Sequence, residues 1–547
     1  MTDESRRLGL VVAGSLAEGI EVRLDPCVSV EEMAVGRYVV VQGRLRRFFG
    51  MVTDVKLGAS TPQFAVSPPD VSDPFVAEVI EGTSTFGSLK VTPMLTLEQT
   101  DVARLGGQEL AKPQPVKTVP SHFSVVADAS EDDVATVFGA ESETNFYVGQ
   151  PLDMETKVCL DLKRFAERSS GVFGKSGTGK TFLTRMLLVG IVHRQIAVNL
   201  VFDMHNEYGW AGRTEDGREV KGLRQLFGSR VSIFTLDERS SLDRGVSADE
   251  VVEIGYDEVE PEDISLLRET LSMTEAQIES IYRLARRFGE RRWLAQFLAL
   301  DSADEREALA QEMGLNPSTL TVLHRKMDTR IARLPFLRPE SSRNSIRKIV
   351  EFLMAGKSIV LEFGRHNSLD AYILVANILT RRIHEEYVEA MDRARGNKAA
   401  EPPHLVITIE EAHKFLSSDV ADQTIFGTIA REMRKYNVTL LVVDQRPSGI
   451  ADEVMSQIGT RVTCLLDDEK DIGAVLSGVS GAQALRGVLA RLDSRQQALI
   501  LGHAVPMPVV IRTREYGTNG SYAEFQFAEA AALHLVAKQD VDDLFPE

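Results

Sequence analysis

Apolar runs that end abruptly in polar residues dominate the hydrophobic pattern of the chain. Three of them occupy 197–202, 404–409 and 438–443, and shorter runs occur at 171–173 and 358–363. Runs of this length, nearly all apolar, are typical of strands buried inside a sheet. Segments with helical apolar spacing follow at 182–193 and 371–387. This alternation predicts an α/β core with a buried sheet.

The regions on either side of this core have different patterns. The N-terminal part has short strand-like runs at 20–24, 38–41, 48–55 and 90–93, separated by turn residues, which predicts a small β-barrel. The region 238–348 is helical and rich in charge, as expected of an insertion. We therefore expect five segments: 1–120, barrel and proline-rich connector; 121–237, first part of the core; 238–348, helical insertion; 349–515, second part of the core; 516–547, C-terminal helix and acidic tail.

Residues 497–503 and 509–512 are expected to form edge strands, and 391–403 an exposed loop. The basic cluster at Arg286, Arg287, Arg291 and Arg292 is either a solvated helix face or a surface that contacts phosphates or a partner. The acidic cluster at 203–207 either joins the nucleotide-side network or a neighbouring subunit, or only hydrogen-bonds at a strand end.

The strongest chemical signal is the phosphate-binding loop G-x-x-x-x-G-K-[ST] at 174–181. Its eight residues are Gly174, Lys175, Ser176, Gly177, Thr178, Gly179, Lys180 and Thr181. The glycines let backbone N–H groups surround the β-phosphate, Lys180 reaches the β- and γ-oxygens, and the Thr181 hydroxyl is placed to hold Mg²⁺. A strand before the loop and a helix after it are the setting that this motif needs, so the sequence predicts ATP and Mg²⁺ as cofactors.

Two further strand ends carry the groups that hydrolysis needs. Glu410 and Glu411 end the run at 404–409, where Glu410 is expected on the metal side and Glu411 as the base that polarises the attacking water. Gln445 follows the next strand and is suited to sensing the γ-phosphate or orienting water. His205 and His413 lie near glutamates, but their spacing matches no zinc motif.

Cations gather just before that last strand. Arg431, Arg434 and Lys435 lie at a predicted helix end, which favours positive charge in any case. The alternative is an arginine finger that reaches the nucleotide of the next subunit, because a guanidinium can neutralise charge on the transferred phosphoryl group.

The order GKSGTGKT, VFDMHNEYG, VITIEEAHKFL and REMRKYNVTLLVVDQRPS resembles the HerA branch of the HerA/FtsK hexameric DNA translocases. The resemblance extends to the N-terminus, where Leu8–Ala13, Val35–Arg44 and Phe49–Val55 look like the small barrel of that family. It implies a RecA-like P-loop ATPase core, a homo-hexamer, and Arg434 at the finger position with Arg431 as the second choice. The family usually has Asp where this chain has Glu410, so the longer side chain changes the metal-side contact.

Composition bounds the possible partners. The chain has 547 residues, 62 basic against 80 acidic, and a formal charge of −18, which argues against a surface that grips DNA generally by its phosphates. A ring with a few basic side chains in its pore remains compatible with this charge. Three scattered cysteines fit reduced thiols, and the absence of a bilayer-length apolar stretch or signal-peptide core predicts a cytoplasmic protein with no membrane partner.

The sequence thus predicts an ATP-dependent translocase or helicase that moves double-stranded DNA. By resemblance, its partner is a NurA-like nuclease in DNA end processing or another effector in phage defence. The alternative is a nucleotide-gated ring that activates a partner effector without travelling on DNA.

Overall fold

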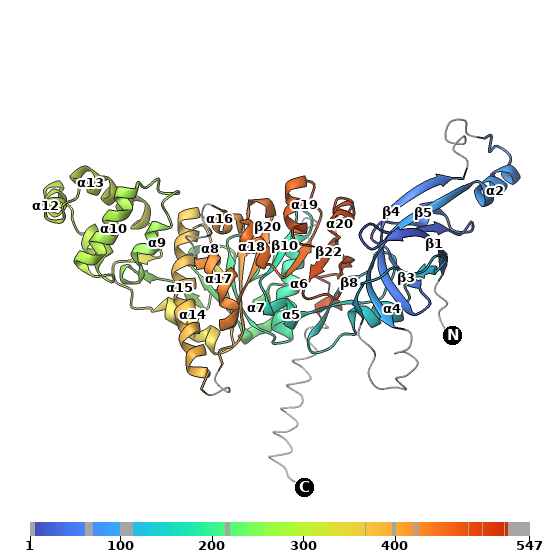
Figure 1. Ribbon diagram of the computed structural model, residues 1–547. Helices are drawn as coiled ribbons and strands as arrows, with labels where there is room; N and C mark the ends of the chain where they lie inside the picture. The colour runs from blue at the N-terminus through green and yellow to red at the C-terminus, as the bar shows by residue number, and fades with distance from the viewer. Residues whose placement is uncertain are drawn as a thin grey trace, which may run out of the picture.

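The computed structural model contains three parts arranged in a row (Figure 1). The N-terminal barrel lies at one end, a large sheet covered by helices lies in the middle, and the helical insertion lies at the other end. The described residues are 6–60, 69–98, 113–213, 219–366, 368–396, 401–418, 421, 425–479, 481–494, 496–518 and 520–522.

Six strands close the N-terminal barrel. They are β1 (Arg7–Ser15), β2 (Gly19–Leu24), β3 (Tyr38–Gln42), β4 (Arg46–Ala59), β5 (Thr85–Glu98) and β7 (Val125–Asp128). The order is β2-β1-β7-β3-β4-β5, and a β2–β5 pairing closes the ring, so only the short β6 (Gln114–Pro115) is left at its edge. Strand β7 lies beyond the boundary expected at residue 120, because this final strand follows the proline-rich connector.

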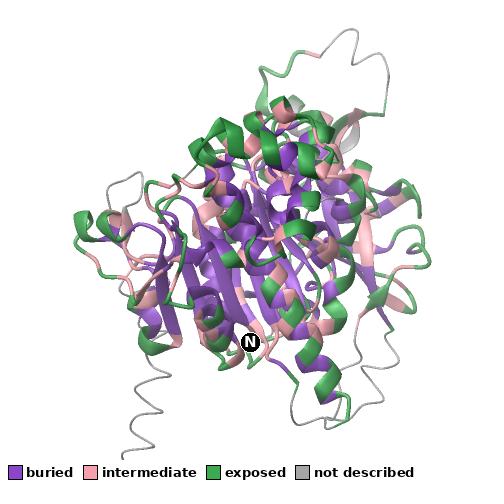
Figure 2. Ribbon diagram, turned by 90° about the vertical axis from the view of Figure 1, so that its left-hand side faces the viewer, coloured by how far each residue is buried: buried purple, intermediate pink, exposed green. Residues whose placement is uncertain are grey.

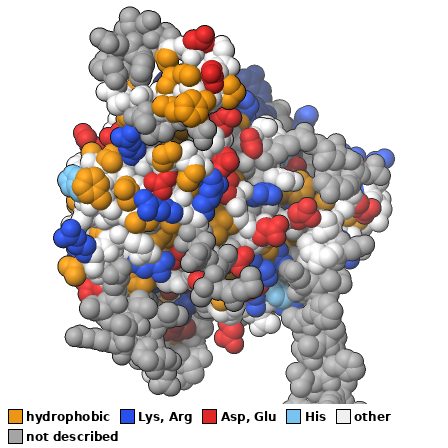
Figure 3. Space-filling view, turned by 90° about the vertical axis from the view of Figure 1, so that its right-hand side faces the viewer, with side chains coloured by type: hydrophobic (Ala, Val, Ile, Leu, Met, Phe, Trp, Pro, Cys, Tyr) orange, Lys and Arg blue, Asp and Glu red, His pale blue; other side chains and the backbone are white. Residues whose placement is uncertain are grey.

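Outside this ring, β4 and β5 extend beside a short helix. This helix, α2 (Pro74–Thr83), begins at the cap Asp73 and carries the exposed Phe75. Acidic, basic and apolar side chains are interspersed on this end of the molecule (Figure 3). That mixture agrees with a surface that does not grip DNA by a continuous positive field.

The middle of the protein is a sheet of twelve strands in the order β15-β14-β18-β11-β19-β20-β10-β21-β22-β23-β8-β9. The eight strands from β15 to β21 are parallel. Their bounds are β15 (Glu250–Val251), β14 (Val231–Thr235), β18 (Ser358–Glu362), β11 (Val198–Asp203), β19 (Leu405–Glu410), β20 (Val438–Asp444), β10 (Ser170–Phe173) and β21 (Thr460–Thr463). The long strands of this set are buried along their whole length (Figure 2), as their apolar sequence predicted.

The strand order gives the core its RecA-like character. Strand β10 leads into the phosphate-binding loop, and β20 lies between it and β19, whose end carries Glu410. Parallel strands end at the same edge of the sheet, so the loop and the glutamates, with β20 between them, are two strand spacings apart, about 9.6 Å. A water and a γ-phosphate fit in that interval.

The remaining four strands run antiparallel. They are β22 (Gln497–Gly502), β23 (Val509–Thr513), β8 (Asn145–Gln150) and β9 (Val158–Asp161). The expectation that 497–503 and 509–512 form edge strands is wrong, because β8 and β9 continue the sheet beyond them. The partner of β23 on this side, β8, lies about 360 residues earlier in the chain, which local patterns do not reveal.

Helices cover both faces of this sheet (Figure 1), and two of them matter most for the site. Helix α6 (Lys180–His193) starts directly from the phosphate-binding loop and is buried along most of its length. Helix α15 (Leu369–Ala394) runs through residues that were expected to begin a loop at 391, since Met391 and Ala394 pack into the protein. The other helices that surround the sheet include α4 (Glu131–Phe138), α5 (Leu162–Glu167), α7 (Leu223–Phe227), α14 (Ser345–Met354), α16 (His413–Leu416), α17 (Ile425–Glu432), α18 (Asp452–Gln457), α19 (Glu469–Leu476) and α20 (Ala482–Leu489).

The insertion is mainly helical. Its helices are α8 (Glu238–Asp243), α9 (Pro261–Ser265), α10 (Glu275–Phe288), α11 (Trp293–Leu298), α12 (Ala303–Met313) and α13 (Pro317–Lys326), and β16 (Ile254–Gly255) pairs with β17 (Leu337–Arg338). Arg381 of α15 bonds Asp263 and Glu260, which ties the insertion to the core. Arg286, Arg287, Arg291 and Arg292 are exposed, and Arg287 pairs with Glu312, as on a solvated helix face.

The predicted C-terminal helix from Tyr522 and the acidic tail lie outside the described residues beyond Tyr522 itself. Among the described residues, no helix is both long and apolar enough to cross a membrane. Cys27, Cys159 and Cys464 are all free thiols.

Candidate nucleotide site

The phosphate-binding loop connects β10 to α6 and is shaped by its glycines. Gly179 caps α6 with φ +90°, a left-handed conformation that glycine adopts without the steric cost of a side chain. Gly174 lies so close to Cys464 that an added Cβ would be 2.8 Å from the Cys464 Cβ. The loop is anchored at both sides, since Gly174 N–H donates to Asp444 and Lys175 N–H donates to Leu465. The backbone amides are therefore held as a preformed anion cradle.

A cavity of about 670 Å³ opens on this cradle. Seven residues of the predicted loop line it, from Lys175 to Thr181, together with Glu410, Glu411 and Gln445. Gly174 lies at the base of the loop, behind these residues. The structure thus brings the two predicted strand ends and the phosphate-binding loop to one cavity.

Lys180 faces several carboxylates. Burial lowers the pKa of Lys180, while Asp444, Glu411 and Glu410 act in the opposite direction, in that order. The ammonium group therefore lies close to the carboxylates at the ends of the neighbouring strands. Lys175 instead pairs with the exposed Asp467 at 2.5 Å. Its contribution to the cradle is its backbone.

Glu410 is almost completely buried, and its two carboxylate oxygens differ. Oε1 accepts a hydrogen bond from the Tyr208 hydroxyl at 2.7 Å, whereas Oε2 has no hydrogen-bond partner among the described residues. Burial, and secondarily the nearby Asp203, raises the pKa of Glu410 to about 8. A cation or a cation-bound water near Oε2 would reverse this effect by favouring the ionised form.

Thr181 and Glu410 are the residues that would hold Mg²⁺ in this cavity. Both residues line the cavity, and among the described residues Glu410 Oε2 has no hydrogen-bond partner. The described residues contain no cluster of three or more metal-binding side chains. Mg²⁺ in phosphate sites commonly keeps several waters and takes few protein ligands, so this sparse donor set fits it.

Glu411 follows immediately and is set apart by its backbone. Its φ of +50° is left-handed, which is uncommon for a residue with a side chain and concentrates at functional sites. The Gln445 amide donates to Glu411 Oε1 at 2.7 Å. The two strand ends therefore touch through the predicted base and the predicted sensor.

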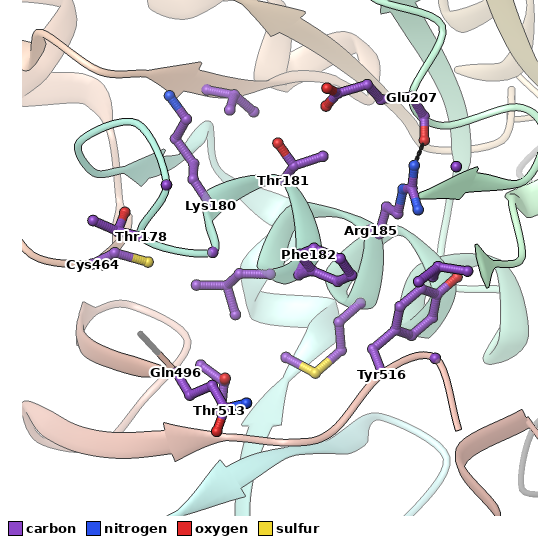
Figure 4. A pocket seen from close by; sticks show the side chains of 18 of the residues that line it. Thr178, Lys180, Thr181, Phe182, Arg185, Glu207, Cys464, Gln496, Thr513 and Tyr516 are labelled. Carbon is purple, nitrogen blue, oxygen red and sulfur yellow. Dashed lines mark hydrogen bonds between the residues drawn. The ribbon is translucent and has the colours of Figure 1, made fainter. Parts of the chain in front are cut away.

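The segment after β11 carries the acidic cluster, whose members have different contacts within the chain. Asp203 accepts hydrogen bonds from the backbone N–H groups of Glu207 and Tyr208 at 2.8 and 2.9 Å, so it organises the loop. His205, Asn206 and Glu207 line the cavity. Arg185 of α6 donates to the Glu207 carbonyl (Figure 4). Asp203 is thus a strand-end hydrogen-bonding residue, and Glu207 is on the nucleotide side.

The opposite wall of the cavity comes from the C-terminal part of the core. Gln496, Thr513 and Tyr516 lie across from the loop that carries Thr178 and Lys180 (Figure 4). Tyr516 is fixed by donating to the Lys221 carbonyl at 2.8 Å. Sequence reasoning missed this wall because it treated β22 and β23 as edges. Gln496 has a left-handed backbone, with φ +60°, but the sequence alone does not reveal this conformation.

Arg434, the predicted arginine finger, lies away from this cavity. It is exposed on the 3₁₀ turn Met433–Tyr436 after α17, and it does not line the cavity of its own chain. Arg431, near the end of α17, lies 3.9 Å from Glu453.

The fold and the cavity together define a P-loop ATPase with a RecA-like core and an N-terminal β-barrel. The family described as Helicase HerA, central domain, matches residues 146–383, and the HAS barrel domain family matches residues 8–104. The chain belongs to the HerA family of helicases and is an ATP-hydrolysing enzyme.

Individual proteins show the same similarity. The DNA double-strand break repair helicase HerA of Sulfurisphaera tokodaii is 23% identical over 93% of each chain. The protein of the same name from Pyrococcus furiosus is 22% identical over 75% of this chain and 76% of its own. Among solved structures, VirB4 of Thermoanaerobacter pseudethanolicus gives a TM-score of 0.44 at 14% identity, covering 69% of this chain and 98% of that chain.

Proposed function

We propose that this protein is an ATP-driven motor that forms a homo-hexameric ring and moves double-stranded DNA through it. The observation that carries the proposal is the meeting of Lys180, Glu410, Glu411 and Gln445 in one cavity of a HerA-family chain. The names of the relatives support DNA as the track. On the family resemblance, the motor works in the cytoplasm with a NurA-like nuclease or another defence effector.

The proposed chemistry is in-line hydrolysis of ATP. Lys180 and the loop amides bind the β- and γ-phosphates, and Gln445 and Glu411 hold the attacking water. As the water oxygen bonds to the γ-phosphorus, its proton passes to Glu411 and the bond to the β-phosphate oxygen breaks. At the far side of the cavity, Phe182 and Tyr516 offer an aromatic surface for the adenine ring of ATP, and Gln496 offers an amide. Thr181, and Glu410 through a water, would hold Mg²⁺, which when bound would neutralise phosphate charge.

The exposed position of Arg434 supports a site shared between subunits. A guanidinium that lies outside its own cavity is available to the nucleotide of a neighbouring chain. We expect Arg434→Ala to bind ATP normally but to lower kcat by at least about 10²-fold, because arginine fingers contribute that much or more. Binding is measured with a fluorescent ATP analogue and turnover by phosphate release.

The control is Lys435→Ala, which removes the adjacent exposed cation and should keep normal turnover. Mixing gives the decisive evidence: co-assembled Arg434→Ala and Lys180→Ala subunits should regain some activity, because some interfaces then pair an intact loop with an intact finger. Recovery should require subunit exchange. Normal turnover of Arg434→Ala alone would move the assignment to Arg431.

The motor proposal itself is tested by two measurements on the wild-type protein. Duplex DNA should stimulate ATP hydrolysis, and the protein should displace a roadblock from duplex DNA only while ATP is hydrolysed. A ring scaffold that activates an effector without moving would bind ATP and its partner but leave the roadblock in place.

A further inference from the structure

His413 lies beside the proposed catalytic centre, and none of the roles described above uses it. It is the first residue of α16, two positions after Glu411, and its side chain is 26% exposed. Asp444, which ends β20 and is fully buried, holds it twice. The His413 backbone N–H donates to Asp444 Oδ2 at 2.6 Å, and the ring Nδ1 lies 3.0 and 3.1 Å from the two carboxylate oxygens.

This double contact fixes the direction of the imidazole ring. With Nδ1 bonded to Asp444, the other ring nitrogen faces Glu411, at 3.9 Å from its Oε2. The Gln445 amide bonds the other oxygen, Oε1. The carboxylate of the proposed base is therefore flanked on both sides by groups from two neighbouring strand ends.

Charge favours the doubly protonated ring at this position. The groups that face the ring are Asp444 from β20, Glu411 from the turn after β19, and Lys414 from α16 itself. The turn Pro447–Gly449 also packs against it, but through Gly449, which carries no charge. The hydrogen bond to Asp444 is the largest cause that raises the pKa of His413, against burial and Lys414.

We infer that His413 is a positioning residue for ATP hydrolysis: fixed by Asp444, its imidazolium and the Gln445 amide grip Glu411 from both sides and aim it at the attacking water. The inference rests on the proposed role of Glu411. In this structure the His413 ring nitrogen lies 3.9 Å from Glu411 Oε2, and a shift of about 1 Å would make this contact a hydrogen bond.

Two isosteric variants separate this role from a merely structural one. In His413→Asn the amide nitrogen takes the place of Nδ1, so the contact to Asp444 is kept and the contact to Glu411 is lost. In His413→Gln the amide nitrogen takes the place of the other ring nitrogen, so the reach to Glu411 is kept. We expect His413→Asn to lower kcat at least about tenfold with KM changed less than about twofold, and His413→Gln to stay within about threefold of wild type.

The pH profile of kcat gives an independent readout. Wild-type kcat should fall as pH rises through the pKa of His413, above the ordinary histidine value near 6.5, because the imidazolium is then lost. His413→Gln should lack this limb, since an amide does not titrate. Gln483→Ala, which changes an exposed glutamine of α20 away from the cavity, is the control for general effects.

Wild-type kcat in His413→Asn would overturn the inference, as would a loss in His413→Gln equal to that in His413→Asn. If a variant fails to fold, the wild-type profile still decides, because a kcat that does not fall as pH rises above the ordinary histidine value contradicts the role. Failure of the proposed function is distinguishable: Glu411→Gln would then hydrolyse ATP at the wild-type rate. A large loss in Glu411→Gln with none in His413→Asn would reject only this inference.

Discussion

Replacing Lys180 by alanine is expected to abolish ATP hydrolysis while leaving the protein folded. The Lys180 ammonium lies in a cavity with Asp444, Glu411 and Glu410 around it. Among the described residues the other lysine that lines this cavity is Lys175, whose side chain pairs with Asp467. The variant therefore brings triphosphate charge next to three carboxylates without the cation that offsets it. We expect turnover to fall by at least about 10³-fold, equivalent to about 4 kcal/mol of transition-state stabilisation.

The matched control is Lys163→Ala, which removes an exposed lysine on α5 away from the cavity. It should hydrolyse ATP at the wild-type rate, and both variants should show the thermal unfolding of the wild-type protein in the absence of nucleotide. Steady-state phosphate release measures the rates. Substantial turnover by Lys180→Ala would reject the assignment of this cavity as the hydrolytic site.

The second large effect is expected at Glu411. Glu411→Gln keeps the size of the side chain and its contact with Gln445, but it removes the carboxylate that accepts the proton of the attacking water. General bases contribute about 10²–10⁴-fold, so we expect kcat to fall by that amount while ATP still binds. A fluorescent nucleotide measures binding, and a single-turnover experiment measures the chemical step.

Glu155→Gln, at an exposed position on the surface, serves as the control and should behave like the wild type. Unchanged turnover in Glu411→Gln would transfer the base role, and Glu410 would be the first residue to test. The structure favours Glu411, because Glu410 is buried and bonded to Tyr208, whereas Glu411 reaches the cavity beside Gln445.

The sequence predicted the core well because its chemistry is local. The phosphate-binding loop needs glycines at fixed spacing, and buried parallel strands need continuous apolar runs, so β10, β11, β19 and β20 could be located from the residues alone. Because parallel strands end at one edge of the sheet, the polar residues after these strands could also be expected to meet. The cavity contains Glu410, Glu411 and Gln445.

Contacts between distant segments could not be predicted in the same way. The pairing of β23 with β8 makes an interior strand of a segment that looks like an edge, and no local pattern encodes that partner. The cavity wall at Gln496 and Tyr516 depends on this pairing. Likewise, helical spacing predicted α15, but its buried end at Ala394 depends on packing against the rest of the core.

The role of individual polar atoms also emerged only from geometry. The sequence shows a glutamate at 410, but not that Tyr208 donates to one of its oxygens while the other has no hydrogen-bond partner among the described residues. It shows a histidine at 413, but not that Asp444 turns its ring toward Glu411. Both depend on side-chain direction at strand ends, including the left-handed backbone of Glu411, which residue spacing does not specify.

Displacement of a roadblock from duplex DNA tests the central claim most directly. The measurement uses a duplex that carries a tightly bound protein block and follows its release with wild-type protein, ATP and Mg²⁺. The motor account predicts release that requires hydrolysis and is absent with Lys180→Ala, with Glu411→Gln, or with a non-hydrolysable ATP analogue. If the wild-type protein hydrolyses ATP in the presence of the duplex but leaves the block in place, the protein does not translocate and the account is contradicted.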